Sequence, residues 1–352
     1  MSWEDYSAEQ NKKNPFENHA CGFRQGKEYQ IIMEKTEIPV IDVIIPAYRP
    51  DDSFHKLIRL LLEQSVKPHH IYVLQTIEDG EQVLQPLDQR MSVHPVPKKQ
   101  FDHGATRDYG AGLAVKDIGD DISQHYILFM TQDAVPAGTE LLERLVKPFG
   151  DDRTAITYAR QLAREEADLL ERLTRVHNYP PEDQVKSKED LERLGIKTYF
   201  CSDVCAMYRL DRYMEQGGFV HPTIFNEDMI MASRMIQAGY QVVYCGSAEV
   251  FHSHNYSCMQ QFHRNFDLGV SQKQYREVFE SISSEKEGAG YAKSTLLYLL
   301  KRGKPGKAFY FALQCGFKLI GYKLGKNYDH LPRKMVLWCT MTPGYVLFHR
   351  DE

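Results

Sequence analysis

The regular pattern of the chain begins at Ile38-Pro39-Val40-Ile41-Asp42-Val43-Ile44-Ile45-Pro46. A run of β-branched residues that closes on a proline is typical of a buried strand ending in a turn. Apolar residues at helical spacing follow in 54–64, and residues 70–76 have the composition of a second buried strand. A helix over 105–115 and a strand over 126–131 continue the alternation. This order predicts an α/β fold with a mostly parallel sheet flanked by helices.

The second half of the chain continues this pattern less regularly. We expect strands over 155–160, 199–209 and 241–245 and helices over 164–176 and 226–239. Turn residues separate these segments, but no stretch is polar and long enough to force two independent domains.

Charge is distributed unevenly along the chain. The 352 residues have a net charge of −5, with 42% hydrophobic and 26% charged residues, as in an ordinary globular protein. Residues 293–350 hold eleven Lys and Arg against one acid, Asp329, whereas residues 1–292 carry a net charge of −13. A basic tail of this kind indicates an anionic partner. Nucleic acid is not the partner we expect, since the acidic remainder would repel it.

The compartment follows from what the sequence lacks. It has no run of about 18 apolar residues that would predict a transmembrane helix. Residues 1–14 contain no apolar segment of a secretory signal, and the seven cysteines are too scattered for a disulfide framework. We therefore expect a cytoplasmic protein with a polar N-terminal arm over 1–36.

Polar side chains follow the predicted strands where each one ends. Pro46 and Tyr48 close the first strand, Asp79 lies in the turn after the second, and Gln132 and Asp133 follow the third. Ligands of parallel sheets bind beyond the carboxyl ends of the strands. A carboxylate there can hold a hard divalent cation, which makes Asp133 a candidate metal ligand. The alternative for an isolated Asp is to cap a turn.

Two helix starts carry further candidates. Gly104 and Arg107 lie in Phe101-Asp102-His103-Gly104-Ala105-Thr106-Arg107-Asp108, where glycine permits close backbone approach and a helix N-terminus favours phosphate. The alternative is a capped helix with an exposed arginine. Glu227 and Asp228 begin the helix expected over 226–239. Either can serve as general base for an acceptor hydroxyl, although acids also favour helix N-termini for dipole reasons alone.

Two histidines and an arginine complete the set. His252 and His254 lie on one face of an extended segment and can complete a metal site begun by Asp133. The alternative is a pair of ordinary surface or core histidines. Arg264 lies on the following predicted helix, where it can contact a diphosphate or simply face solvent.

The order of these motifs resembles glycosyltransferase family 2. Segments 44–48, 103–107, 129–134 and 226–228 follow one another as in that family. FDHGATRD, TQDAVP, YARQL, FCSDVCAMYR, NEDM and HSHNYS are similar to segments of its bacterial rhamnosyltransferases. The resemblance spans roughly residues 38–270. It implies the Rossmann-like GT-A fold and transfer of a sugar from a nucleotide donor with inversion.

The resemblance also implies a role for each candidate residue. The Asp-x-Asp signature of the family falls on 132–134, where Asp133 would hold the divalent cation, Mn²⁺ or Mg²⁺. Asp79, with Glu78 as a rival, matches the acid that contacts the nucleoside. The general base maps onto the Glu227-Asp228 pair, with Asp228 preferred. The remaining contacts to the nucleotide sugar would come from Pro46, Tyr48, Gly104, Arg107, Gln132 and Arg264.

The implied donor is dTDP-L-rhamnose, and the implied acceptor is a hydroxyl of a lipid-linked or polysaccharide glycan of the cell envelope. Two alternatives stay open. One is the same fold with a UDP-hexose or UDP-N-acetylhexosamine as donor. The other is a non-catalytic subunit that binds a nucleotide sugar within a biosynthetic complex.

The basic tail completes the domain organisation. We expect a glycosyltransferase domain over 37–270, with a nucleotide-sugar half over 37–160 and an acceptor half over 161–270, and a helical extension over 271–352. Lysines interleaved with apolar and aromatic residues in 301–320 suit a helix lying in a membrane interface. Residues 293–350 would then attach the protein to the inner face of the cell membrane. The alternative is a tail helix packed on the domain.

Overall fold

The computed structural model describes residues 39–119, 122, 124–280 and 285–349, without the side chains of 285–289 and 348–349. The predicted N-terminal arm over 1–36 lies outside the described residues. From Pro39 onward the chain forms one compact unit.

The strands are β1 Val40–Tyr48, β2 His70–Ile77, β3 Met91–Pro97, β4 His125–Met130, β5 Val135–Pro136, β6 Thr154–Leu162, β7 Gln184–Lys186, β8 Cys205–Arg209 and β9 Gln241–Phe251. The helices of the sheet region are α2 Asp52–Leu62, α3 His103–Ile118, α4 Leu141–Val146, α5 Leu169–Asn178, α6 Leu191–Leu194, α7 Leu210–Glu215 and α8 Glu227–Gln237. The C-terminal helices are α9 Cys258–Gln274, α10 Arg276–Phe279, α11 Glu285–Lys301, α12 Pro305–Gly325, α13 Arg333–Cys339 and α14 Pro343–His349.

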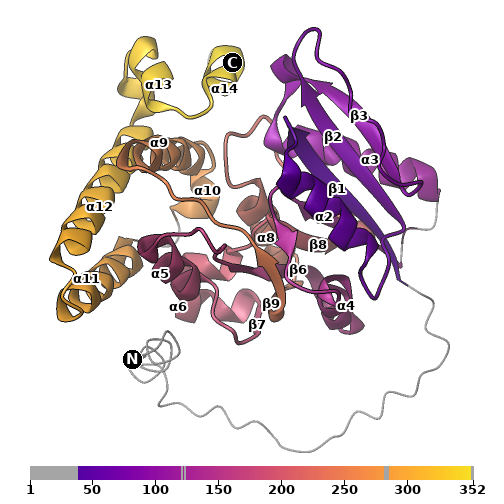
Figure 1. The fold of residues 1–352 in the computed structure, drawn as a ribbon, viewed down its shortest axis with the longest axis horizontal. Helices are drawn as coiled ribbons and strands as arrows, with labels where there is room; N and C mark the ends of the chain where they lie inside the picture. The colour runs from indigo at the N-terminus through magenta and orange to yellow at the C-terminus, as the bar shows by residue number, and fades with distance from the viewer. Residues whose placement is uncertain (1–38, 120–121, 123, 281–284, 350–352) are drawn as a thin grey trace, which may run out of the picture. The chain divides into compact units, whose positions relative to one another are not determined.

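The strands of the described residues form one mixed sheet (Figure 1). Its order is β3-β2-β1-β4-β8-β6-β9-β5, and β7 pairs with β9 beside this path. β1 is parallel to β2 and β4, β2 to β3, and β6 to β9, whereas β8 runs antiparallel to both β4 and β6. Six strands therefore share one direction, which confirms the prediction of a mostly parallel sheet.

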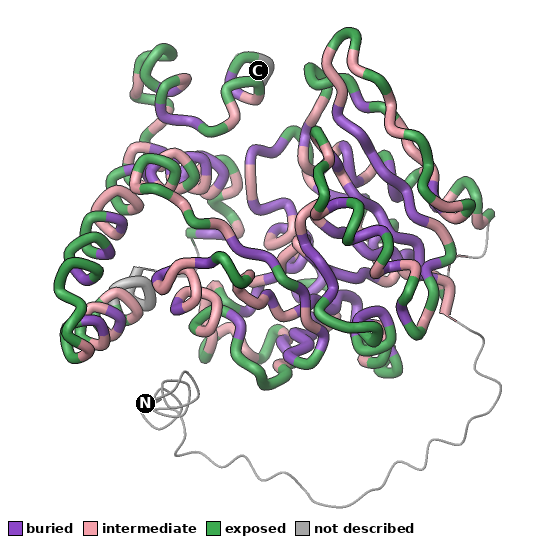
Figure 2. The backbone as a smooth tube through the Cα atoms, viewed as in Figure 1, coloured by how far each residue is buried: buried purple, intermediate pink, exposed green. Residues whose placement is uncertain are grey.

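Helices cover both faces of the sheet. Phe54 and Leu57 of α2 and Leu142 of α4 pack in one apolar cluster with the strands. Ala111 of α3 and Met235 of α8 pack in the cluster on the other face. Figure 2 shows the strands as the most continuously buried part of the chain, as expected for strands enclosed by two helical layers.

Two predicted elements begin later than their composition suggests. The strand expected over 199–209 starts only at Cys205, since residues 195–199 form a 3₁₀ helix and Cys205 N–H closes a turn on the Ser202 carbonyl at 3.2 Å. The helix expected over 164–176 starts at Leu169, because the Asp168 side chain accepts the Glu171 N–H and caps it. Both predictions were wrong about where the element starts. The residues before each true start form turns whose polar side chains belong to the candidate site described below.

The C-terminal helices pack on the sheet domain through α9. A Cβ at Gly269 of α9, or at Gly321 or Gly325 of α12, would overlap the backbone of the facing helix. These glycines let the two helices approach to backbone contact. An apolar cluster that includes Phe266 of α9 and Val336 of α13 extends this packing. Each helix among the described residues is too short or too polar to cross a lipid bilayer.

The predicted division into domains stays a prediction. α9 runs across the expected boundary at residue 270, so the extension over 271–352 shares a helix with the part of the chain before it.

Candidate active site

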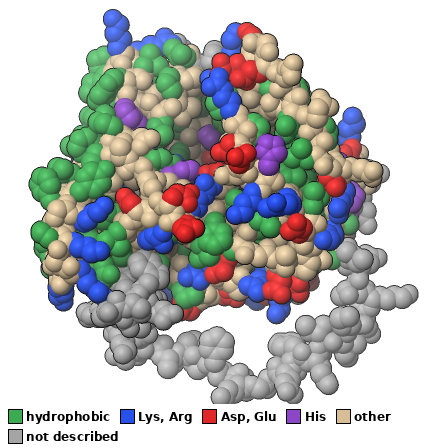
Figure 3. Space-filling model, in the orientation of Figure 1, with side chains coloured by type: hydrophobic (Ala, Val, Ile, Leu, Met, Phe, Trp, Pro, Cys, Tyr) green, Lys and Arg blue, Asp and Glu red, His purple; other side chains and the backbone are tan. Residues whose placement is uncertain are grey.

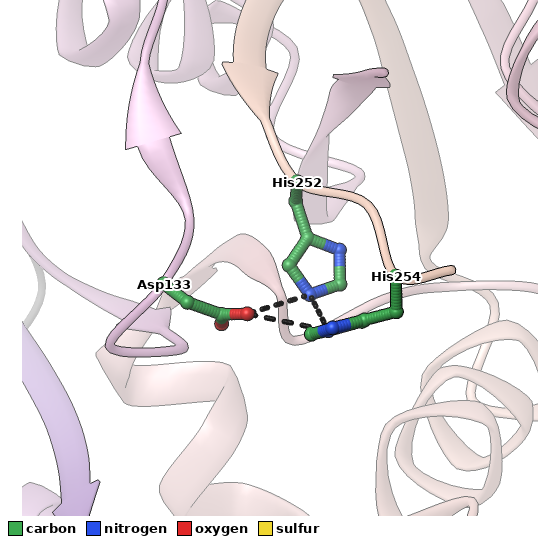
Figure 4. A group of neighbouring side chains, drawn as sticks. All are labelled: Asp133, His252 and His254. Carbon is green, nitrogen blue, oxygen red and sulfur yellow. Dashed lines mark hydrogen bonds and ion pairs between the residues drawn. The ribbon is translucent and has the colours of Figure 1, made fainter. Parts of the chain in front are cut away.

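Asp133, His252 and His254 meet at one edge of the sheet (Figure 4). The Asp133 Oδ2 atom lies 3.2 Å from His254 Nε2 and 3.6 Å from His252 Nε2, and the two nitrogens lie 3.1 Å apart. β5 and β9 explain the meeting, because Val135 pairs with Phe251 and thereby sets the turn after β4 beside the end of β9. Three potential ligand atoms therefore converge as the sequence predicted for a metal site.

A neighbouring glutamine fixes the orientation of His252. The Nη1 group of Arg175 points at Gln161 Oε1, and an arginine can only donate, so this atom is the carbonyl oxygen. His252 Nδ1, 2.9 Å from the same oxygen, therefore carries a proton and donates it. The Nε2 atom of His252, which lies toward Asp133, is then unprotonated and keeps its lone pair. Burial lowers the pKa of His252 to about 3, which keeps the ring neutral.

The carboxylate of this group is ionised. Burial alone would raise the pKa of Asp133, but the hydrogen bond from His254 and the nearby rings of His252 and His254 lower it below its usual value. One carboxylate and two imidazoles are a suitable donor set for a divalent transition metal. The residues present thus fit the metal that the family resemblance implies.

Asp228 lies at the start of α8, where Asn226 adopts a left-handed conformation with φ 67°. The Asp228 carboxylate accepts the Met229 N–H at 2.7 Å and the Asp203 N–H at 3.3 Å. Burial raises the pKa of Asp228 to about 7, and the charge of Glu227 adds to this rise. A carboxylate that titrates near neutrality is suited to act as a general base.

Arg107 is buried in a group of acids beneath Asp228. Its Nη1 lies 2.9 Å from Glu227 Oε1, and its Nε lies 3.7 Å from Asp203 Oδ2. Tyr208 donates its hydroxyl hydrogen to Asp203 Oδ1 at 2.7 Å. The charge of Arg107 is thus balanced by Glu227 inside the protein, although the residue also contributes to the wall of the cavity described below. Asp203 lies in the quoted segment FCSDVCAMYR, but it was not among the candidate site residues because it stands between two cysteines of an expected strand.

Gly104 permits a close backbone approach, as its position predicts. The approaching group is the Val220 carbonyl, which a Cβ at position 104 would overlap. The first turn of α3 is capped by Asp102, whose side chain accepts the Ala105 N–H at 2.8 Å. Gly104 therefore joins the start of α3 to the loop that leads to α8.

A cavity of about 520 Å³ opens at the carboxyl ends of β1, β2 and β4. Its walls include Pro46, Tyr48, Arg107 and Gln132 of the predicted set. The Gln132 side chain accepts the Tyr48 N–H at 2.8 Å and donates to the Tyr48 carbonyl at 3.0 Å, which ties the ends of β1 and β4 together. Figure 3 shows the molecule hollowed between the C-terminal helices and the sheet, with acidic and histidine side chains at the hollow.

Of the two acids that follow β2, Glu78 and Asp79, it is Glu78 that contacts a residue of the cavity wall. Tyr48 donates its hydroxyl hydrogen to Glu78 Oε1 at 2.5 Å, and Lys98 Nζ donates to the same oxygen at 2.7 Å. These two hydrogen bonds lower the pKa of Glu78 to about 2. Asp79 is exposed in the following turn. The choice between them depends on which side chain the turn directs inward, which sequence alone does not reveal.

Arg264 lies near the metal ligands rather than on the wall of this cavity. Its guanidinium carbon is 4.7 Å from the centre of the Phe225 ring and 5.7 Å from that of Tyr256. Tyr256 in turn stacks on His254, with ring centres 5.2 Å apart. Arg164, which the sequence did not single out, donates an Nη2 hydrogen to the Asp133 backbone carbonyl, and the same nitrogen lies 3.9 Å from the Asp133 carboxylate. Two arginines thus flank the predicted metal site.

Comparisons with known proteins show the family of the chain. The chain is 36% identical over 315 residues to the O-antigen chain rhamnosyltransferase RfbN of Salmonella typhimurium, covering 87% of this chain and 95% of that protein. It is 33% identical over 319 residues to the O-antigen chain rhamnosyltransferase WbaN of Salmonella anatum, covering 88% and 96%. The mannosyltransferase PcManGT of Pyrobaculum calidifontis, solved with GDP-Man and Mn²⁺, superposes with a TM-score of 0.54 at 12% identity, covering 84% of this chain and 89% of that one.

The last of these comparisons shows the fold alone, and that fold is the GT-A arrangement expected from the sequence. The family model described as "Glycosyl transferase family 2" matches residues 42–215, which hold β1 to β4, the Asp133 turn and the buried Asp203. Identity above 30% then extends over nearly the whole chain and most of each Salmonella protein. The chain is therefore a glycosyltransferase that belongs to glycosyl transferase family 2.

Proposed function

We propose that the protein transfers L-rhamnose from dTDP-L-rhamnose, with inversion, to a hydroxyl of a lipid-linked or polysaccharide glycan of the cell envelope. The names of the two Salmonella relatives support the sugar and the pathway class. The observation that carries the proposal is the convergence of a carboxylate and two imidazoles at the sheet edge, directly after Gln132 of the cavity wall. A carboxylate of raised pKa, Asp228, accompanies it, and its neighbour Glu227 pairs with Arg107 of the same wall.

Asp228 is the general base in this proposal. It accepts the proton of the acceptor hydroxyl while that oxygen attacks the anomeric carbon of the donor. Inversion needs only this single displacement, so no second carboxylate has to form a bond to the sugar. Glu227, held by Arg107, keeps negative charge beside Asp228 and thereby raises its basicity.

Asp133, His252 and His254 would hold the divalent cation, which supplies positive charge to the departing diphosphate. Two imidazole ligands favour Mn²⁺ over Mg²⁺, since Mg²⁺ prefers oxygen ligands and retains its water. Arg264 and Arg164 flank this position and would add charge-assisted contacts to the same diphosphate. Tyr48 and Pro46 would line the nucleoside part of the pocket, with Glu78 in place of Asp79 as its acid, and Gln132 would contact the donor next to Asp133.

A panel of nucleotide sugars tests the donor. A ligand that binds only the native state stabilises the protein and so raises its melting temperature. At a free ligand concentration of 100 times Kd, the added stability is about 2.7 kcal/mol. We expect dTDP-L-rhamnose with Mn²⁺ to raise the melting temperature by a few degrees. UDP-glucose, UDP-N-acetylglucosamine and GDP-mannose are expected to raise it less. A larger shift with a UDP-sugar would keep the enzyme class and reject rhamnose.

We also propose that the C-terminal helices attach the protein to an anionic membrane surface. α12 packs on α9 by its glycine face, while the opposite side is exposed along its length (Figure 2). The large exposed apolar residues of this region are Leu297, Leu300, Phe309, Tyr310, Leu313, Leu319, Ile320, Met335, Trp338, Met341 and Leu347. Lysines and arginines lie among them, each worth roughly 1 kcal/mol near an anionic leaflet.

Co-sedimentation with vesicles tests the attachment. We expect the protein to pellet with phosphatidylglycerol vesicles and to stay in solution with phosphatidylcholine vesicles. Phe309→Glu should reduce the bound fraction severalfold, because Phe309 is 68% exposed on α12. Val185→Glu, at an exposed apolar residue of β7, is the matched control and should bind as wild type. Equal binding by the two variants would contradict the proposal.

A further inference from the structure

The cavity at the sheet edge has a wall that comes from the far end of the chain. Met341, Thr342, Pro343, Gly344 and Tyr345 line it together with residues of β1, β2 and the start of α3. These five residues join α13 to the first turn of α14 and are named here the C-terminal strap. No residue in the strap was among the candidates drawn from the sequence.

A buried carboxylate on α9 holds the strap in place. Asp267 Oδ1 accepts the Thr340 hydroxyl hydrogen at 2.6 Å, and Asp267 Oδ2 accepts the Met341 N–H at 2.9 Å. The Thr342 N–H then donates to Thr340 Oγ1 at 2.9 Å. A buried carboxylate is costly unless its oxygens are hydrogen-bonded, so these bonds set one position of the strap. A further hydrogen bond, between His263 Nδ1 and the Cys339 carbonyl at 2.7 Å, holds the end of α13 just before Thr340.

The wall of the cavity combines polar residues with apolar and aromatic ones. Arg107 pairs with Glu227 beside Asp228, and Gln132 directly precedes Asp133, so these two residues connect the cavity to the groups that would act on a sugar diphosphate. The strap contributes Met341, Pro343 and Tyr345 to a cavity that also has Tyr48 and Phe101 in its wall. Apolar and aromatic surfaces of this kind accommodate a planar base.

We propose that the C-terminal strap forms the base-side wall of the donor pocket and that Asp267 is the positioning residue that keeps it there. The inference rests on the proposed function, since it assumes that the cavity holds a nucleoside diphosphate. The C-terminal extension is then part of the nucleotide site as well as the membrane-facing part of the protein. Nucleotide affinity depends on residues about 200 positions away from the strand ends that bind the diphosphate.

Calorimetric titration of the full-length protein with dTDP in the presence of Mn²⁺ tests the strap. Met341→Ala removes an exposed side chain of the cavity wall and is expected to weaken dTDP binding about fivefold. Met335→Ala is the matched control, because Met335 is an exposed methionine of α13 outside the cavity wall. It should change the dissociation constant by less than about twofold.

Thr340→Val tests the role of Asp267. The variant keeps the shape of Thr340, which does not line the cavity, and removes the hydroxyl that donates to Asp267. We expect dTDP binding to weaken about five- to tenfold and the KM for the nucleotide sugar to rise by the same factor. The kcat value and the affinity for Mn²⁺ alone should stay as in wild type, which a general loss of structure would not allow.

The outcomes separate this inference from the proposed function. A wild-type protein that binds no nucleoside diphosphate would overturn both. A wild type that binds dTDP, with Met341→Ala and Thr340→Val binding equally well at unchanged melting temperature, would overturn the strap alone. If Thr340→Val lowers the melting temperature, Met341→Ala decides, since it alters only an exposed side chain.

Discussion

Asp228→Asn is expected to lower kcat for sugar transfer about 10³-fold, within the range typical of a lost general base. The amide keeps the size of the side chain and can still accept one N–H, but it cannot take the proton of the acceptor hydroxyl. Binding of dTDP should stay within about twofold of wild type, because Asp228 does not line the cavity. Transfer from dTDP-L-rhamnose and calorimetry with dTDP measure the two quantities.

Asp52→Asn is the matched control for this variant. Asp52 is also an acid in the first turn of a helix, α2, but it is exposed and does not line the cavity. Its replacement removes the same favourable charge at a helix N-terminus, worth about 0.3–1 kcal/mol, without touching the site. An Asp228→Asn protein that turns over as fast as Asp52→Asn would show that another group is the base.

The pH dependence gives a second check on the same residue. The pKa of Asp228 is raised to about 7, and only the ionised form can accept a proton. The kcat value should therefore rise with pH and level off above about 7, falling about tenfold per pH unit on the acid side. The residual activity of Asp228→Asn should lack this acidic limb. A wild-type profile that is flat between pH 5 and 7 would contradict the assignment.

The sequence alone was sufficient to predict which candidate site residues meet at the ends of strands. Asp133 and the two histidines follow β4 and β9, and the antiparallel pairing of Val135 with Phe251 places them side by side. This placement can be expected from the sequence, because a strand end is recognisable as an apolar run that stops at polar residues. The same logic identified the start of α8, where two acids precede an apolar helix.

The residues that the sequence did not reveal act through side-chain direction or long-range packing. Gln161 is an ordinary strand residue until Arg175 and His252 are seen to share its oxygen. Glu78 and Asp79 differ only in which one the turn directs toward Tyr48. The strap meets Asp267 across more than 70 residues of chain, and no local pattern records such a contact.

Asp133→Asn is expected to lower the affinity for Mn²⁺ at least about tenfold, because it removes the only charged ligand of the triad while keeping its volume. Turnover should fall at least about a hundredfold, since charge on the leaving diphosphate is then less well neutralised. Titration of Mn²⁺ by calorimetry and transfer rates at saturating Mn²⁺ measure these effects. Asp88→Asn, at a turn aspartate before β3, is the matched control and should bind Mn²⁺ as wild type.

A second variant tests whether the two histidines of the triad bind the metal. Gln161→Met removes the acceptor that orients His252 without touching a ligand atom, and loss of such a partner typically weakens metal binding about 10–100-fold. Wild type should bind Mn²⁺ more tightly than Mg²⁺, because two of its three ligands are imidazole nitrogens. Equal affinity for the two cations, together with no effect of Gln161→Met, would mean that the histidines do not bind the metal. The cation would then depend on Asp133 and the diphosphate oxygens alone, and His252 and His254 would act only by lowering the pKa of Asp133.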